Sequence, residues 1–209
     1  MELASCRQRP SGIIAVEKPH GRTTRSDLPE LPPEVVAEVD WEPFVPLALE
    51  GGQRSFVSGK PENGLLRVQY FKRQGDNAVV GRSWFGPGAA GPPSHAHGGS
   101  IAAVLDEAMG VAAWSSGYPS VAAHLEVDFR KMIPLGTDTW LEAWVEEARP
   151  RKVRTRGRLL DDEGKPFAEA VGLFVVLDPD RFGDVLEKVA EAMGIDPAEL
   201  LSSIASAHE

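Results

Sequence analysis

Between residues 65 and 177 the chain alternates apolar and polar positions with the period of two that marks β-strands. The expected strands share this alternation and cover residues 65–70, 78–85, 121–130, 139–147, 152–160 and 167–177. Turn-forming residues stand at 75–77, and DDEGKP joins the last two strands, which is typical of hairpins. Strands that follow one another through short turns predict an antiparallel sheet.

One long helix interrupts this series of strands. Residues 95–114 read HAHGGSIAAVLDEAMGVAAW, a stretch rich in small and apolar side chains, and they lie between the second and third strands. An apolar helix in such a sheet has to be covered by the sheet. We therefore predict an α+β chain with a curved antiparallel sheet wrapped around a long central helix, which is the layout of a hotdog fold.

Two flanking regions differ from this domain, which we place at residues 61–180. Residues 1–60 are rich in proline, glycine and charge, and we expect an extension that wraps the core or is partly disordered, with a helical pattern only at 33–41. Residues 181–209 carry two helical patterns. The second begins at Asp196 and Pro197, which we expect to be its N-cap and first position.

Composition narrows the classes of function. The chain has 209 residues and a net charge of −9, which argues against nucleic acids and anionic membranes as partners. A single cysteine, Cys6, excludes a disulfide framework and a zinc site built from several cysteines, and we expect a cytoplasmic protein. No apolar run approaches the roughly 20 residues of a membrane helix.

Asp106 and Glu107 are the only ionisable residues between His97 and Tyr118. An acid inside an apolar helix costs stability unless it is solvated, paired or functional. Asp106 lies seven residues after Gly99, which places both on one face about two turns apart, so that both can address one substrate. Glu107 points about 100° away, and we expect it to be a solvent-facing or interface charge.

Gly98 and Gly99 open the helix, although glycine is a poor helix former. The first N–H groups of a helix lack partners within it and make that end electropositive. A thioester carbonyl placed there would be polarised. Close packing of the helix on the sheet is the alternative explanation for two small residues at this point.

The segment HGGSIAAVLDEAMG resembles the signature helix of the PaaI-type and THEM4-like hotdog thioesterases. In that pattern an acid follows the histidine of His-Gly-Gly by nine residues, and the matching positions here are His97, Gly98, Gly99 and Asp106. The similarity continues through HLEVDFRKMIPLG, ARPRKVRTRG and AEAVGLFVVLDP, and so covers about residues 78–179.

This resemblance implies hydrolysis of an acyl-CoA thioester to a free acid and CoA. Asp106 is then the nucleophile or the general base, and Gly99 supplies an N–H group to the thioester oxygen. His97 orients the loop before the helix or touches the substrate. The contacts to coenzyme A carry over onto Asp128, Arg130, Arg151 and Lys152.

The sequence departs from the family pattern at two positions. Some relatives have a threonine or serine that positions the attacking water, and the matching residue here is Ala122. His124, two residues further along and expected on the same strand face as Ala122, or a group of a partner chain would then position the water. At Met132 a proline is common in the family, and we attach no function to this difference.

A cluster of cations follows the turn after the fourth strand. Period two predicts that one sheet face carries the strand's basic side chains, which are Lys152, Arg154, Arg156 and Arg158. Such a face can bind the phosphates of coenzyme A or can pair with the many acids of the chain. The resemblance favours Arg151 and Lys152 for the first role.

Other readings of the chain remain open at this point. His95, His97 and His124 are a weak metal signal, and we expect neither a metal nor any cofactor beyond the CoA of the substrate. A hotdog dehydratase and a non-catalytic acyl-CoA-binding protein are the alternative functions. We expect a homodimer or larger homo-oligomer with shared sites, because one such sheet leaves uncovered edges and a polar face.

Overall fold

The computed structural model of the chain describes residues 35–43, 55–58, 64–193, 196–199 and 202. The helices and strands follow one another in the order β1 (Trp41–Pro43), β2 (Leu66–Arg73), β3 (Val79–Phe85), a 3-10 turn (Pro87–Ala89), α1 (Gly98–Ser115), β4 (Ser120–Phe129), β5 (Asp138–Arg149), β6 (Lys152–Leu160), β7 (Pro166–Val176) and α2 (Pro179–Met193). The predicted order of two strands, one long helix and four strands is confirmed from β2 to β7, and the unpredicted strand β1 precedes it.

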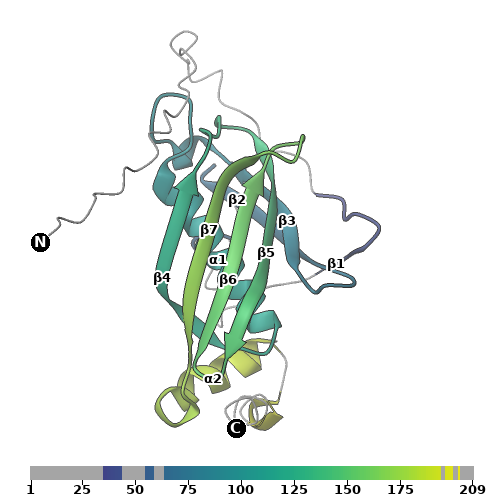
Figure 1. The fold of residues 1–209 in the computed structure, drawn as a ribbon, viewed down its shortest axis with the longest axis vertical. Helices are drawn as coiled ribbons and strands as arrows, with labels where there is room; N and C mark the ends of the chain where they lie inside the picture. The colour runs from purple at the N-terminus through teal and green to yellow at the C-terminus, as the bar shows by residue number, and fades with distance from the viewer. Residues whose placement is uncertain (1–34, 44–54, 59–63, 194–195, 200–201, 203–209) are drawn as a thin grey trace, which may run out of the picture.

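The strands form one curved, antiparallel, seven-stranded sheet in the order β1-β2-β3-β5-β6-β7-β4. The long helix α1 lies on one side of this sheet, and β4 forms the edge seen at the left in Figure 1. The chain therefore has the predicted hotdog architecture, in which the strand that follows the helix is placed at an edge.

The first strand of the sheet replaces a predicted helix. Residues 35–38 have no regular structure, and Trp41–Pro43 pair with Phe71–Arg73 as β1. The expectation of a helix at 33–41 is therefore wrong for its described part. Trp41 stacks on Phe71 with ring centroids 5.2 Å apart, and this contact with the sheet outweighs a helical spacing of only three valines.

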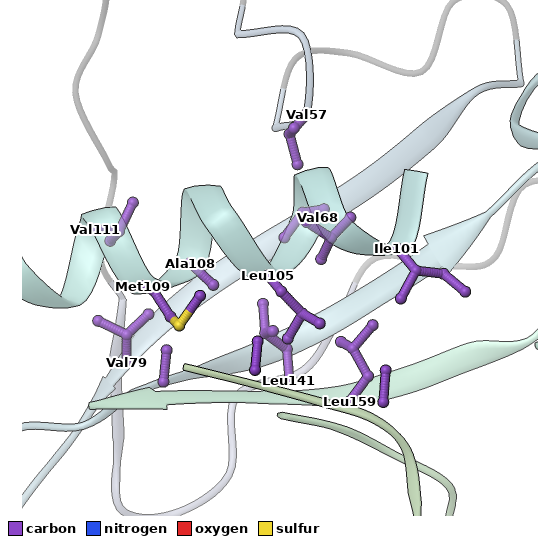
Figure 2. Packing of buried hydrophobic residues seen from close by; sticks show 14 of the residues in the cluster. Val57, Val68, Val79, Ile101, Leu105, Ala108, Met109, Val111, Leu141 and Leu159 are labelled. Atoms are coloured by element: carbon purple, nitrogen blue, oxygen red, sulfur yellow. The ribbon is translucent and has the colours of Figure 1, made fainter. Parts of the chain in front are cut away.

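The core lies between α1 and the concave face of the sheet. Leu105 and Met109 are fully buried on the sheet-facing side of the helix, above Leu141 and Leu159 (Figure 2). Burial of a Leu or Met side chain stabilises the fold by about 1.5–3 kcal/mol. Because these side chains fix which side of α1 faces the sheet, they also determine which helix residues remain accessible to a substrate.

Glycines let the helix approach β7 closely. A Cβ on Gly172 would lie 2.5 Å from Phe174 Cε2 and 3.3 Å from Met109 Cε, and a Cβ on Gly110 would lie 3.4 Å from Phe174 Cε1. The buried Phe174 ring thus fills the space that a glycine on the strand and a glycine on the helix leave between them.

A β-bulge in β4 reverses part of the predicted alternation. Ala122 pairs with Phe174 and His124 with Leu173, so the register shifts by one residue at Ala123. Directly paired residues share a sheet face, and Phe174 faces the helix while Leu173 does not. The expectation that His124 shares a face with Ala122 is therefore wrong. For the same reason Val121 does not share the apolar face of Leu125, Val127 and Phe129.

The C-terminal region is helical as predicted. The helix α2 buries Leu186 and Ala190, while Val185 stays 48% exposed. Residues 197–199 are helical, and Asp196 Oδ1 accepts a hydrogen bond from Ala198 N–H at 2.9 Å, which confirms the predicted N-cap. Among the described residues, no helix is both long and apolar enough to cross a membrane.

We predict that Gly172→Ala destabilises the protein by about 1–3 kcal/mol, because the added methyl group forces Phe174 or Met109 to move within a packed core. Urea unfolding measures the change. Gly183→Ala in α2 is the matched control: no atom lies within 4 Å of the added Cβ. That variant should be neutral or more stable. Equal stabilities of the two variants would contradict the close approach of α1 to β7.

Candidate active site

The loop before α1 is fixed to the segment that precedes β5. Ala96 N–H donates to Ile133 O at 2.9 Å, Leu135 N–H donates to Ser94 O at 2.9 Å, and His97 N–H donates to Ala89 O at 2.7 Å. These backbone bonds hold the start of the helix in one place. Phe129 of β4 lies against it, because a Cβ on Gly98 would be 3.4 Å from Phe129 Cζ.

The first turn of α1 offers one free backbone donor. His97 is the N-cap, and its Nδ1 accepts the Gly99 N–H at 2.9 Å. Ser100 and Ile101 donate to His97 O at 3.0 and 3.2 Å. Among the described residues, nothing accepts the Gly98 N–H. The donor available to a ligand is therefore that of Gly98, whereas Gly99, the predicted donor, becomes available only when the His97 ring moves away.

Asp106 stands half-buried on the flank of α1 next to Gly110. Its Oδ1 atom is buried and has no hydrogen-bond partner among the described residues. Burial, with a smaller contribution from the charge of Glu107, raises the pKa of Asp106 above its ordinary value. At a pH above the folded-state pKa, ionised Asp106 therefore lowers the free energy of unfolding. This loss of stability disappears as the pH falls through that pKa. An unpaired carboxylate kept at a cost to stability is typical of a functional group.

Of the two roles expected for Glu107, a solvent-facing or an interface charge, the structure does not support the first. Its side chain is half-buried and accepts hydrogen bonds from Tyr70 OH at 3.0 Å and from Ser55 Oγ. Tyr70 lies on β2 and Ser55 in the segment 55–58. Sequence analysis missed both residues, because they lie 37 and 52 positions from Glu107 and share no motif with it.

Gly98 and Asp106 lie far apart along the helix. Eight residues at a rise of 1.5 Å each separate their Cα atoms by about 12 Å. A thioester carbonyl requires its hydrogen-bond donor and its attacking group both at about 3 Å. A shared helix face therefore does not by itself bring the Gly98 N–H and the Asp106 carboxylate close together within one chain.

The predicted histidine of β4 lies away from the helix. His124 is exposed on the outer face of the sheet, which is the face opposite Asp106 and Ala122. A second histidine, His95, holds the loop through a hydrogen bond between Nδ1 and Pro93 O at 2.8 Å. Among the described residues, no group of three or more His, Cys, Asp or Glu side chains is arranged to hold a metal ion.

The basic side chains of β6 share the outer face of the sheet, as the period of two predicted. Most of them are neutralised there: Arg154 and Arg156 contact Glu146 at 2.7 and 2.5 Å, and Arg158 contacts Glu142 at 2.5 Å. Arg151 and Lys152 are exposed, and neither forms an ion pair with a described residue. These two cations remain available to an anionic ligand.

The predicted coenzyme A contacts fall at two ends of the sheet. Arg130 bonds to Asp128 and Glu169 near the start of α1, each at 3.1 Å. Glu169 pairs with Arg158, six residues along β6 from Lys152, which is about 20 Å at 3.3 Å per residue. One chain therefore does not bring Arg130 together with Arg151 and Lys152.

Comparison with known proteins agrees with this architecture. The family model of the thioesterase superfamily matches residues 94–168, which include α1 and Asp106. Acyl-coenzyme A thioesterase THEM4 of Xenopus laevis is 30% identical over 149 residues, which cover 70% of this chain and 67% of that protein.

Two solved structures share the fold. A thioesterase superfamily protein superposes with a TM-score of 0.50 at 29% identity, over 52% of this chain and 53% of its own length. The protein smu.793 of Streptococcus mutans, solved with acetyl CoA bound, superposes with a TM-score of 0.50 at 17% identity, over 61% of this chain and 94% of its own. The chain therefore belongs to the hotdog-fold thioesterases, in the family of the acyl-coenzyme A thioesterase THEM4.

Proposed function

We propose that this protein hydrolyses an acyl-CoA thioester and that Asp106 is its catalytic carboxylate. The observation that carries the proposal is the half-buried carboxylate of Asp106, whose pKa is raised and whose buried Oδ1 atom has no hydrogen-bond partner in the described part of the chain. It stands on a helix whose first turn leaves the Gly98 N–H without a described acceptor. A raised pKa makes a carboxylate a better base for the proton of water. The names of the THEM4 relatives support the substrate class.

Hydrolysis needs two groups from the chain. The Gly98 N–H polarises the thioester carbonyl and stabilises the oxyanion that forms on it. Asp106 either attacks the carbonyl carbon, in which case a water molecule hydrolyses the resulting acyl-Asp106 anhydride to the free acid, or takes the proton of a water molecule that attacks directly. Collapse of the tetrahedral intermediate breaks the C–S bond, and the CoA thiolate leaves. A carboxylate and a water molecule supply every group that reacts with the thioester, so we propose a reaction without a cofactor. We also propose that the protein acts in the cytoplasm.

A second copy of the chain completes the site in this proposal. The outer edge of β4 has no partner strand among the described residues, and β4 flanks α1 beside the start of the helix. A two-fold axis at this edge makes the two α1 helices antiparallel. Gly98 of one chain then faces Asp106 of the other, which removes the separation of about 12 Å along a single helix.

The same arrangement gives the nucleotide of coenzyme A a place to bind. We propose that Arg151 and Lys152 hold its phosphates, because they are the exposed cations of the basic strand without a described carboxylate partner. Asp128 and Arg130 lie at the other end of the sheet, beside the start of the helix, and contribute from the second chain. His97 acts as the cap that fixes the Gly98 donor.

We predict that Asp106→Asn lowers kcat by about 100-fold or more, because the amide neither attacks nor accepts a proton. Release of free thiol from a panel of acyl-CoA substrates measures the rate and identifies the best acyl group. Asp184→Asn, at an exposed position of α2, is the control and should keep full activity. A wild-type rate for Asp106→Asn on the best substrate would refute the assignment.

The shared site makes a sharper prediction about mixed dimers. Gly98→Pro removes the free N–H at the first helical position, where proline is tolerated, and should lower kcat by about 100- to 1,000-fold. When Asp106→Asn and Gly98→Pro chains are mixed and allowed to exchange, half of the dimers contain one chain of each kind. Each of these has one intact site, so about a quarter of wild-type activity returns. No recovery after exchange verified by mass spectrometry would place the site within one chain.

We predict that replacing Arg151 and Lys152 with alanine raises KM for acyl-CoA by roughly tenfold and changes kcat little, because exposed charge-assisted contacts contribute about 1 kcal/mol each or less. The comparison substrate is a pantetheine thioester, which lacks the 3′-phosphate and the diphosphate, and its KM should hardly change. Replacement of Arg154, which is already paired with Glu146, is the matched control. An equal rise in KM for both substrates would show that these cations do not hold the nucleotide.

A further inference from the structure

Three segments far apart in the sequence meet at the carboxylate of Glu107. Tyr70 OH of β2 lies 3.0 Å from Oε1, and Ser55 Oγ contacts Oε2. Val57, two residues after Ser55, is 4% exposed and packs on the side of α1 away from Leu141 and Leu159 (Figure 2). The segment 55–58 therefore covers the helix directly above Glu107, and the carboxylate is its anchor on α1.

The hydrogen bonds around Ser55 decide which partner holds the proton. Ser55 Oγ accepts the N–H groups of Val57 at 3.1 Å and of Ser58 at 3.2 Å. A hydroxyl group has one donor and two acceptor positions, so the Ser55 proton is directed to Glu107. Burial, and then the charge of Glu107, raises the pKa of Tyr70 well above its ordinary value, so its phenol also remains a donor. Two O–H donors on two oxygens match the ionised form of Glu107.

Within the described part of the chain, no charge other than Glu107 acts on Asp106 to a comparable degree. Among the described residues, Glu107 is the one charged group that shifts the proton affinity of Asp106. The side chains that β4 and β7 turn toward α1 near Asp106 are not titratable: Ala122, Leu125, Val127 and Phe174. From β2 the titratable group is Tyr70, which is bonded to Glu107, and His97 lies more than two turns away at the start of the helix.

We propose that Glu107 is a positioning residue for the hydrolysis: anchored by Tyr70 and Ser55, it holds a fixed negative charge next to Asp106 and acts on the reaction through that carboxylate. This inference rests on the catalytic role proposed for Asp106. A fixed like charge opposes ionisation of its neighbour, and the neighbour then binds a proton more strongly. The hydrogen bonds from Tyr70 and Ser55 keep the Glu107 side chain from turning away from Asp106.

The experiment is the pH dependence of kcat/KM and kcat for the Glu107→Gln variant. Removal of the charge should move the acidic limb of both profiles to lower pH by about 0.5–1 unit. The weaker base should lower the plateau of kcat by about two- to threefold. Glu107→Asp keeps the charge, and its limb should stay within about 0.3 unit of the wild-type limb. Glu163→Gln, which removes an exposed charge from the β6–β7 turn, is the matched control and should not move the limb.

A second variant covers the case in which Glu107→Gln does not fold. Glu107→Met combined with Tyr70→Phe replaces both partners of the Tyr70–Glu107 hydrogen bond with apolar groups of similar shape. The Ser55 hydroxyl loses its acceptor on Glu107 but keeps the N–H groups of Val57 and Ser58. In this variant the limb should move in the same direction. Titration of the Asp106 carboxyl carbon by ¹³C NMR reports its pKa independently of turnover.

The outcomes separate the two proposals. An Asp106→Asn variant with full activity overturns the proposed function, whatever Glu107 does. An inactive Asp106→Asn variant together with an unmoved limb and an unmoved ¹³C titration in the Glu107 variants overturns the positioning role alone. A shift of the same size in Glu163→Gln also overturns it, because the effect would then come from net charge and not from the anchored carboxylate.

Discussion

The packing of α1 into the concave face of the sheet is the interaction on which the rest of the structure depends. Leu105 and Met109 are fully buried against the sheet, and glycines on β7 and α1 allow the close approach. Because a helix turns about 100° per residue, burial of one side fixes the direction of every other side chain on it. Asp106 is thereby turned to one flank of the helix and Glu107 to another.

Two adjacent carboxylates consequently have very different surroundings. Glu107 receives one hydroxyl donor on each oxygen, whereas Asp106 has a buried oxygen without a described partner. Adjacent titratable groups in unlike environments are a common way of assigning different tasks to chemically similar residues. Asp106 suits the reacting role, because its ionised form is the less stabilised of the two and gains most from a proton or a new bond.

The rigidity of α1 also limits what a single chain can do. The free N–H of Gly98 and the carboxylate of Asp106 are fixed about 12 Å apart along the helix, and the cations at the two ends of the sheet are about 20 Å apart. A thioester carbonyl is much smaller than the distance of about 12 Å between Gly98 and Asp106 along the helix. In the proposed dimer a single two-fold axis makes the two α1 helices antiparallel. Gly98 of one chain then lies near Asp106 of the other, and the cations at opposite ends of the two sheets lie near each other.

The sequence by itself determined the fold class, the order of the elements and the helix that carries His97, Gly98 and Asp106. Periodicity and turn residues are local signals, and the thioesterase signature lies within one helix, so neither needs distant contacts to be read. The tertiary structure alone decided that Trp41 joins the sheet, that a bulge turns His124 away from Ala122, and that Glu107 is held by Tyr70 and Ser55. Each of these depends on contacts between residues far apart in the chain, where packing and hydrogen bonding outweigh local propensity.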